Sequence, residues 1–249
     1  MATPRRVAIV TGASSGIGRA TALSLAAQGW LVVIVGRRAA NLAELKEQIR
    51  SRGGVSVAVA ADLGKLKDIE NVVEQARVAG GRIDALLNIA GIGGLNQVMS
   101  PDDEVQEMIA ANLLAPIRLM RAVIPIMTAQ GSGAIVNVGS VKGEIAIGGI
   151  YSATKFGIRG LTDSVRREIA GTGIHISLVE PGYIATEMTA HRTSRMPGPE
   201  VIVRAIESCL TRTRRRVVVP RWYRLVILAS NMFPAIVDRA YNGKITSHT

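Results

Sequence analysis

The sequence predicts an α/β fold: a single doubly wound parallel sheet with helices on both faces. Short apolar runs rich in β-branched residues alternate along the chain with segments of helical periodicity. The runs are apolar at successive positions, which is typical of strands buried on both faces of a parallel sheet. A length of 249 residues, 48% of them hydrophobic, is enough for one such domain with its own core.

The predicted strands share this apolar character. In order, they are Arg6–Thr11, Leu31–Val35, Val55–Ala60, Ala85–Ile89, Ala134–Val138, Ile174–Val179 and Val217–Val219. The segments between them have apolar residues at helical spacing and predict the helices Gly16–Gln28, Asn41–Arg52, Lys65–Val78, Pro101–Thr128, Tyr151–Ala170 and Pro199–Leu210. Because strand and helix alternate throughout, residues 1–249 are predicted to form one domain that binds ligands at the carboxyl ends of its strands.

The positive charge is concentrated near the C-terminus. Thirty basic and 19 acidic residues give a net charge of +11. Nine arginines and two acidic residues between Arg192 and Arg224 supply +7 of it. Such a block could face nucleic acid, an anionic membrane or a phosphorylated ligand. Eight aromatic residues are few for stacking bases, so nucleic acid is the least favoured of these partners.

Cysteine and histidine usage predicts neither a disulfide framework nor a metal site. Cys209 is the only cysteine. His175 lies within a predicted strand, while His191 and His248 stand alone. We expect no cleavable leader and no spanning helix, because no run of 18 apolar residues occurs. These features predict a cytoplasmic protein.

The C-terminal region contains an uncharged apolar segment, Leu225–Val237, with Trp222 and Tyr223 before it and arginines at both ends. It is too short to cross a bilayer. Two interpretations remain open. Residues 221–240 could lie on an anionic membrane surface, or they could form a buried or dimer-facing helix over the ligand cleft. Either interpretation predicts a hydrophobic substrate.

The turn after the first strand, Thr11–Gly18, carries three glycines. Gly12 permits a tight turn, Gly16 lets the backbone approach a pyrophosphate, and Gly18 lets the following helix pack closely. The N-terminus of that helix offers N–H groups and positive potential to a phosphate. Glycines also suit any tight strand-to-helix turn, so the loop alone leaves nucleotide binding undecided.

The end of the second strand indicates which nucleotide is bound. NAD-binding sheets place an acidic residue there for the ribose hydroxyl, whereas this chain has Arg37 and Arg38. A guanidinium binds a 2′-phosphate that a carboxylate would repel. The arginines predict NADP(H), with Arg37 the preferred contact. The alternative is that both are solvated surface residues.

A Tyr–Lys pair provides the strongest chemical signal. Tyr151 and Lys155 lie one helical turn apart on the same face, and composition predicts only about 0.1 such pair by chance. The pair follows Ser140, which ends the strand Ala134–Val138 and therefore belongs to the ligand crevice. This placement argues against an incidental surface pair.

With these residues in order, the chain resembles the short-chain dehydrogenase/reductase family. The matches, in the family's order across residues 6–186, are Thr11–Gly18, Asp62-Leu63, Asn88-Ile89-Ala90-Gly91, Asn112, Ser140, Tyr151 with Lys155, and Pro181-Gly182 with Thr186. The resemblance implies a Rossmann-type fold and an NADP(H)-dependent oxidoreductase of secondary alcohols and carbonyls. It also implies a homodimer or homotetramer, with the helices Asn112–Thr128 and Tyr151–Ala170 as candidate interfaces.

The resemblance also assigns roles. Tyr151 is the implied general acid/base, and Lys155 is expected to lower its pKa and hold the nicotinamide ribose. Ser140 is implied to bind the reacting oxygen, and Asn112 to place a relay water. The implied cofactor contacts are Gly12, Ser14, Ser15, Gly16, Ile17, Gly18, Arg37, Arg38, Asp62, Leu63, Asn88, Ala90, Gly91, Tyr151, Lys155, Pro181, Gly182, Ile184 and Thr186. Residues 1–190 would then form the core, and 191–249 an extension at the substrate cleft.

Two departures from the family pattern affect these expectations. Ile89 replaces the second Asn of the usual Asn-Asn-Ala-Gly. The segment Val141–Ile150 has ten residues between Ser140 and Tyr151 where the family has about a dozen, so the substrate pocket should be reshaped. The alternatives are a non-catalytic dinucleotide-binding scaffold or a basic nucleic-acid-binding protein, and the complete Asn-Ser-Tyr-Lys set speaks against the first.

Overall fold

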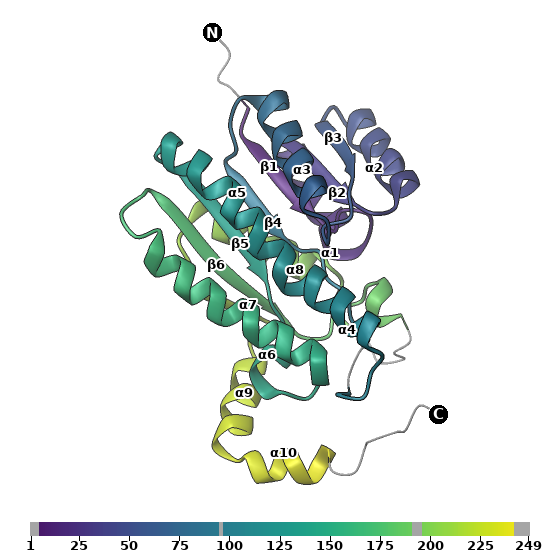
Figure 1. Cartoon of the computed structure of the whole chain (residues 1–249), viewed down its shortest axis with the longest axis vertical. Helices are drawn as coiled ribbons and strands as arrows, with labels where there is room; N and C mark the ends of the chain where they lie inside the picture. The colour runs from purple at the N-terminus through teal and green to yellow at the C-terminus, as the bar shows by residue number, and fades with distance from the viewer. Residues whose placement is uncertain (1–4, 95–96, 191–195, 242–249) are drawn as a thin grey trace.

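The computed structural model describes residues 5–94, 97–190 and 196–241, and the strands in this part form one seven-stranded parallel sheet (Figure 1). The strands are β1 Val7–Thr11, β2 Leu31–Gly36, β3 Val55–Ala60, β4 Ala85–Asn88, β5 Gly133–Val138, β6 Ile174–Pro181 and β7 Arg216–Val219. Their order is β3-β2-β1-β4-β5-β6-β7. The predicted fold class, a doubly wound parallel sheet, is confirmed.

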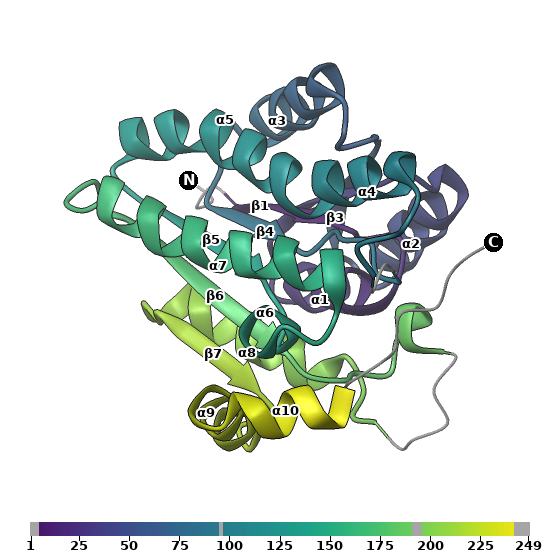
Figure 2. The ribbon, with the colours of Figure 1, turned by 60° about the horizontal axis from the view of Figure 1, so that its bottom comes forward.

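The helices cover both faces of this sheet. They are α1 Gly16–Ala27, α2 Ala39–Ser51, α3 Leu66–Gly80, α4 Asp102–Ile109, α5 Ala115–Gln130, α6 Lys142–Ile145, α7 Gly149–Glu168, α8 Glu200–Thr211, α9 Tyr223–Met232 and α10 Pro234–Tyr241. One core cluster joins α3, α5 and α7 to the sheet, and a second joins α1, α2 and α8 to its other face. Figure 2 shows the resulting layers of helix, sheet and helix.

The strand order reverses direction at β1, which fixes the position of the site. β1 pairs with β2 on one side and with β4 on the other, so the two halves of the sheet diverge from there. The loops that leave the carboxyl ends of β1 and β4 run to opposite faces and open a crevice between them. The glycine turn follows β1, and residues 89–94 follow β4.

The helix predicted over Pro101–Thr128 is present, but it is interrupted by a π-helical turn, Ala110–Leu114, between α4 and α5. Pro116 supplies a physical reason, since it lacks the N–H that would bond the carbonyl of Asn112 in a regular α-helix. Residues 102–130 are long and apolar enough to cross a membrane by length and composition alone. Leu119, Val123 and Met127 are buried in the core, as expected for the central helix of a sheet protein.

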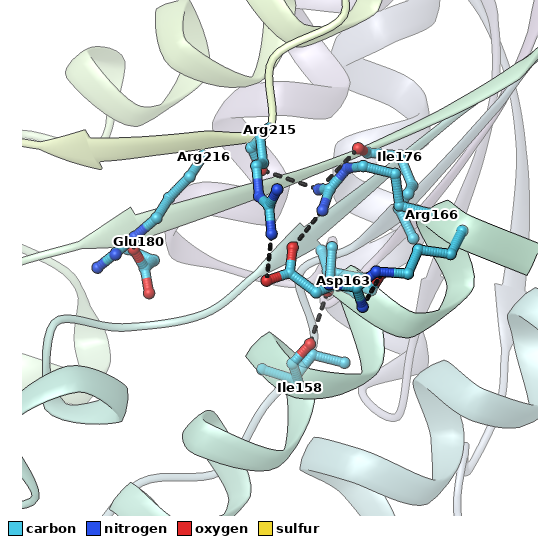
Figure 3. Close-up of polar contacts among 10 residues, drawn as sticks. Ile158, Asp163, Arg166, Ile176, Glu180, Arg215 and Arg216 are labelled. Carbon is cyan, nitrogen blue, oxygen red and sulfur yellow. Dashed lines mark hydrogen bonds and ion pairs between the residues drawn. The ribbon is translucent and has the colours of Figure 1, made fainter. Parts of the chain in front are cut away.

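The arginine block separates into two groups, because β7 lies inside it. At the start of β7, Arg215 pairs with Asp163 of α7 at 3.1 Å, and Arg216, the first residue of the strand, pairs with Glu180 of β6. Figure 3 shows these contacts beside Arg166, which donates hydrogen bonds to the carbonyls of Ile176 and Arg215. After β7, Arg221 and Arg224 flank the start of α9. Arg192, Arg195, His191 and His248 lie outside the described residues.

Candidate active site

The glycine turn has the geometry expected of a phosphate-binding loop. Gly12 has φ +69°, and a Cβ there would lie 2.9 Å from the Ala90 Cα, so the turn lies directly against the segment after β4. A Cβ at Gly18 would lie 2.2 Å from the Gly12 carbonyl oxygen, so only glycine lets α1 start this close to β1. The Thr11 hydroxyl fixes the crevice floor by accepting hydrogen bonds from the N–H groups of Ile89 and Ala90.

A cavity of about 610 Å³ lies over this turn. Its wall includes most of the predicted cofactor contacts: Gly12, Ser14, Ser15, Gly16, Ile17, Gly18, Arg37, Arg38, Asp62, Leu63, Ala90, Gly91 and Thr186. Ile89 of the motif after β4 also lines the cavity. Further lining residues, which the motifs did not indicate, are Gly36, Ala61, Gly64, Ile92, Gly93, Glu107, Ala110, Ala111, Glu187 and Met188. Gly36 and Ala61 end β2 and follow β3, so their place at the carboxyl edge of the sheet was the available signal.

Both predicted phosphate-binding arginines pair with carboxylates at the cavity wall. Arg37 donates to Glu107 of α4 at 2.5 Å, and Arg38 donates to Glu187 at 2.9 Å. Arg38 also approaches the Ser14 hydroxyl of the glycine turn, at 3.3 Å. The two guanidinium groups therefore lie at the end of the cavity formed by β2 and the turn, as binding of a 2′-phosphate requires.

Tyr151, Ser140 and Lys155 come together at the other end of the crevice. α7 carries Tyr151 and Lys155, and the loop after β5 brings the Ser140 side chain near enough to Tyr151 to affect its pKa. Lys155 is buried, donates to the Val138 carbonyl at 3.0 Å, and lies 5.6 Å from the centre of the Tyr151 ring. A Cβ at Gly91 of the cavity wall would lie 3.5 Å from the Lys155 Nζ, so this amine lies just behind the wall.

The protonation equilibria differ from the sequence-based expectation that Lys155 lowers the pKa of Tyr151. Burial raises the pKa of Tyr151, the Ser140 hydrogen bond opposes that rise, and the neighbouring Tyr183 adds to it. Burial also lowers the pKa of Lys155 to about 8. Desolvation is therefore the main influence on the protonation of both groups. Tyr151 is a protonated phenol at neutral pH.

Asn112 lies close to this polar cluster, but its side chain bonds the loop after β4 and the neighbouring Thr154. Its Oδ1 accepts from the Ile92 N–H at 2.7 Å, and its Nδ2 donates to the Ile92 carbonyl and to Thr154. The side chain is therefore occupied in fixing the loop after β4. Its backbone carbonyl lies in the π-helical turn, and Pro116 cannot supply the usual helical donor to it. A relay water would have to bind at this carbonyl.

The shortened segment after Ser140 forms the helix α6, which packs directly on α7. A Cβ at Gly143 would lie 2.7 Å from the carbonyl carbon of Lys155 and 2.8 Å from its oxygen. This contact places the short segment after Ser140 against the turn of α7 that carries Tyr151 and Lys155. Ala146 ends α6 in the left-handed region at φ 50°, which lets the chain return to α7 within four residues.

Several predicted cofactor contacts lie outside the cavity. Asn88 is buried and donates to Asn137 at 2.8 Å, so it links β4 to β5 in the core. Ile184 is also a core residue, and Gly182 lies under the Tyr223 ring of α9. Pro181, Tyr151 and Lys155 are likewise absent from the cavity wall. Of these, only Tyr151 and Lys155 lie at the polar cluster beside it.

With this geometry established, comparisons with known proteins define the class. The short chain dehydrogenase family model matches residues 6–197, and the chain belongs to this family. Ketoacyl reductase HetN of Nostoc sp. is 32% identical over 95% of this chain and 88% of its own length. A 3-oxoacyl-(acyl-carrier-protein) reductase of Synechocystis sp. is 37% identical over 74% of this chain and 76% of its own.

Solved structures agree with this assignment. A metagenomic short-chain oxidoreductase in complex with NADP has a TM-score of 0.76 and 33% identity, covering 86% of this chain and 96% of that one. The predicted family is confirmed, and the predicted cofactor agrees with the one in that structure. The chain is thus a short-chain oxidoreductase.

Proposed function

We propose that the protein is an NADP(H)-dependent oxidoreductase that interconverts a carbonyl and a secondary alcohol. The observation that carries the proposal is the buried Lys155, which lies 5.6 Å from the Tyr151 ring and directly behind Gly91 in the wall of a dinucleotide-sized cavity, with Ser140 near enough to Tyr151 to affect its pKa. Two arginines stand at the cavity's other end, where a 2′-phosphate would bind. NADPH bound along this cavity supplies the hydride.

In this proposal Tyr151 donates its proton to the carbonyl oxygen of the substrate. Burial keeps the phenol protonated at neutral pH, which is the form required for reduction. Ser140 hydrogen-bonds the same oxygen and stabilises the charge that develops there. Lys155 holds the nicotinamide ribose, and the Asn112 carbonyl holds a water that returns protons toward Lys155.

The substrate is proposed to be apolar, and the enzyme to be a cytoplasmic homodimer or homotetramer formed by one catalytic domain per chain. The apolar C-terminal helices next to the catalytic loop support the substrate class. The exposed Phe156 of α7 supports assembly through the candidate interface helix Tyr151–Ala170. The two ketoacyl reductase relatives make a β-keto thioester the first substrate class to assay.

The Tyr151→Phe variant tests the reaction. It removes the proton donor and keeps the ring, so NADPH-dependent reduction should fall by roughly 100-fold or more while NADPH still binds. Turnover is followed by NADPH absorbance with a panel of ketones and β-keto thioesters, and binding by NADPH fluorescence. Unchanged turnover would overturn the assigned role, and a wild-type chain that binds NADPH but reduces no carbonyl would favour the non-catalytic scaffold.

A further inference from the structure

The outer surface of the two C-terminal helices carries an unusual concentration of exposed apolar side chains. Of thirteen large apolar side chains exposed in the described residues, six lie on this short segment. We name them the docking face: Trp222, Leu225, Leu228, Met232, Phe233 and Ile236. Figure 1 shows α9 and α10 projecting beyond the body of the molecule. Exposed apolar surfaces of this kind mark contact sites in soluble proteins.

The sequence of α9 separates its two faces. Tyr223 packs on Gly182, and Ile227 is buried with Val141 and Val218, so these residues attach the helix to the body. Leu225, Leu228 and Met232 recur at i, i+3 and i+7 and are 71%, 56% and 61% exposed. The apolar stripe of the helix therefore points away from the protein. Packing within this chain does not account for it.

The charges around the docking face favour an anionic surface. Arg221 and Arg224 stand at the start of α9 and Arg239 near the end of α10, all exposed, against the single acid Asp238. None of these arginines makes an ion pair with another described residue. A second copy of the chain would bring the same arginines close to one another, whereas an anionic lipid surface would attract them.

We propose that the docking face binds the surface of an anionic lipid bilayer. The apolar stripe would enter the boundary between headgroups and acyl chains, with the arginines at headgroup level. Trp222, stacked on Tyr223 at 3.9 Å, stands at the edge of the face, where such rings are favoured. Because α9 packs on Val141 and Gly182, the bilayer would lie next to the segments that carry Ser140 and Tyr183.

Sedimentation of the 249-residue protein with lipid vesicles tests the proposal. The wild-type chain should co-sediment with phosphatidylglycerol–phosphatidylcholine vesicles, and only weakly with pure phosphatidylcholine. The double variant Leu225→Ser/Leu228→Ser removes apolar area from exposed positions without changing the charge, and should lower the partition coefficient by roughly tenfold or more. The matched control is Leu66→Ser/Val78→Ser on α3, whose side chains are 53% and 68% exposed; it should bind as the wild type.

Other outcomes would overturn the proposal. These are failure of the wild-type chain to bind the anionic vesicles, or equal binding by the docking-face variant and the control. If light scattering without lipid gives the docking-face variant a lower molar mass than the wild type, the face instead binds a second copy of the chain. The Tyr151→Phe variant should bind vesicles normally, so the lipid result stands whether or not the proposed reaction is correct.

Discussion

Arg37 and Arg38 are each held by a carboxylate, Glu107 or Glu187, that a bound 2′-phosphate would have to displace. In the unliganded protein these carboxylates keep the guanidinium groups at the cavity wall. They also compete with the cofactor. Exposed ion pairs of this kind contribute about 1 kcal/mol or less, so the competition should be measurable but modest.

Substitutions on both sides of the Arg37–Glu107 pair test this arrangement. Arg37→Glu should weaken NADPH binding by roughly tenfold or more and leave NADH binding nearly unchanged, because only NADPH carries the 2′-phosphate. Glu107→Gln should strengthen NADPH binding by up to about fivefold, since it frees Arg37. Fluorescence titration with both cofactors measures this. Equal losses of affinity for NADPH and NADH in Arg37→Glu would show that the arginine does not contact the 2′-phosphate.

For single residues, the sequence predicted where the reactive side chains lie better than it predicted their ion pairs and protonation states. Ser140, Tyr151 and Lys155 come together as expected, because the strand ends and the helical spacing are local features. Glu107 and Glu187 could not be predicted, since each reaches its arginine across many residues of chain. The raised pKa of Tyr151 was also out of reach, because it depends on burial by the surrounding fold.

Among the elements, α6 determines whether Ser140 and Tyr151 meet. It is only four residues long, and its position depends on the close contact between Gly143 and the Lys155 backbone. Such a helix has little intrinsic stability and forms because of its tertiary contacts. This explains why the strands and the long helices were predicted from periodicity, whereas α6 and the π-helical turn were not.

The Gly143→Ala variant tests the role of α6. The added methyl group would lie within 3 Å of the Lys155 backbone, so α6 must move, lowering stability by about 1–3 kcal/mol and turnover by roughly tenfold or more. Gly160→Ala is the matched control on α7, because nothing lies within 4 Å of its Cβ. It should raise the melting temperature and leave turnover intact. Normal turnover in Gly143→Ala would mean that α6 tolerates displacement.

Across the whole molecule, a buried charge cluster joins four elements behind the catalytic loop. Glu144 of α6 pairs with Arg159 of α7 and with Arg216 of β7, both at 2.9 Å. Arg216 also pairs with Glu180 of β6, and Figure 3 shows these two side chains together. The side chains of Glu144 and Glu180 are each 1% exposed. Part of the C-terminal arginine excess therefore faces these buried acids within the fold and is not available to an external partner.

The protonation of this cluster should control stability as the pH changes. Burial and the adjacent Glu144 raise the pKa of Glu180 to about 8 from an ordinary value of 4.5. The folded protein then holds a proton on Glu180 that the unfolded chain has lost above pH 4.5. The free energy of unfolding should therefore fall as the pH rises from about 4.5 to 8. Each unit of pKa difference corresponds to about 1.4 kcal/mol, so a loss of roughly 1–5 kcal/mol is expected.

Glu180→Gln removes this dependence, because the amide keeps the size of the side chain and is neutral at every pH. Urea unfolding of the variant between pH 5 and 8 should give a flatter profile than that of the wild type, and at pH 8 the variant should be the more stable protein. Glu74→Gln, at an exposed carboxylate paired with Arg77, should keep the wild-type slope. If Glu180→Gln also keeps that slope, the buried acid is ionised across this range, and Arg159 and Arg216 together hold both carboxylates charged within the fold.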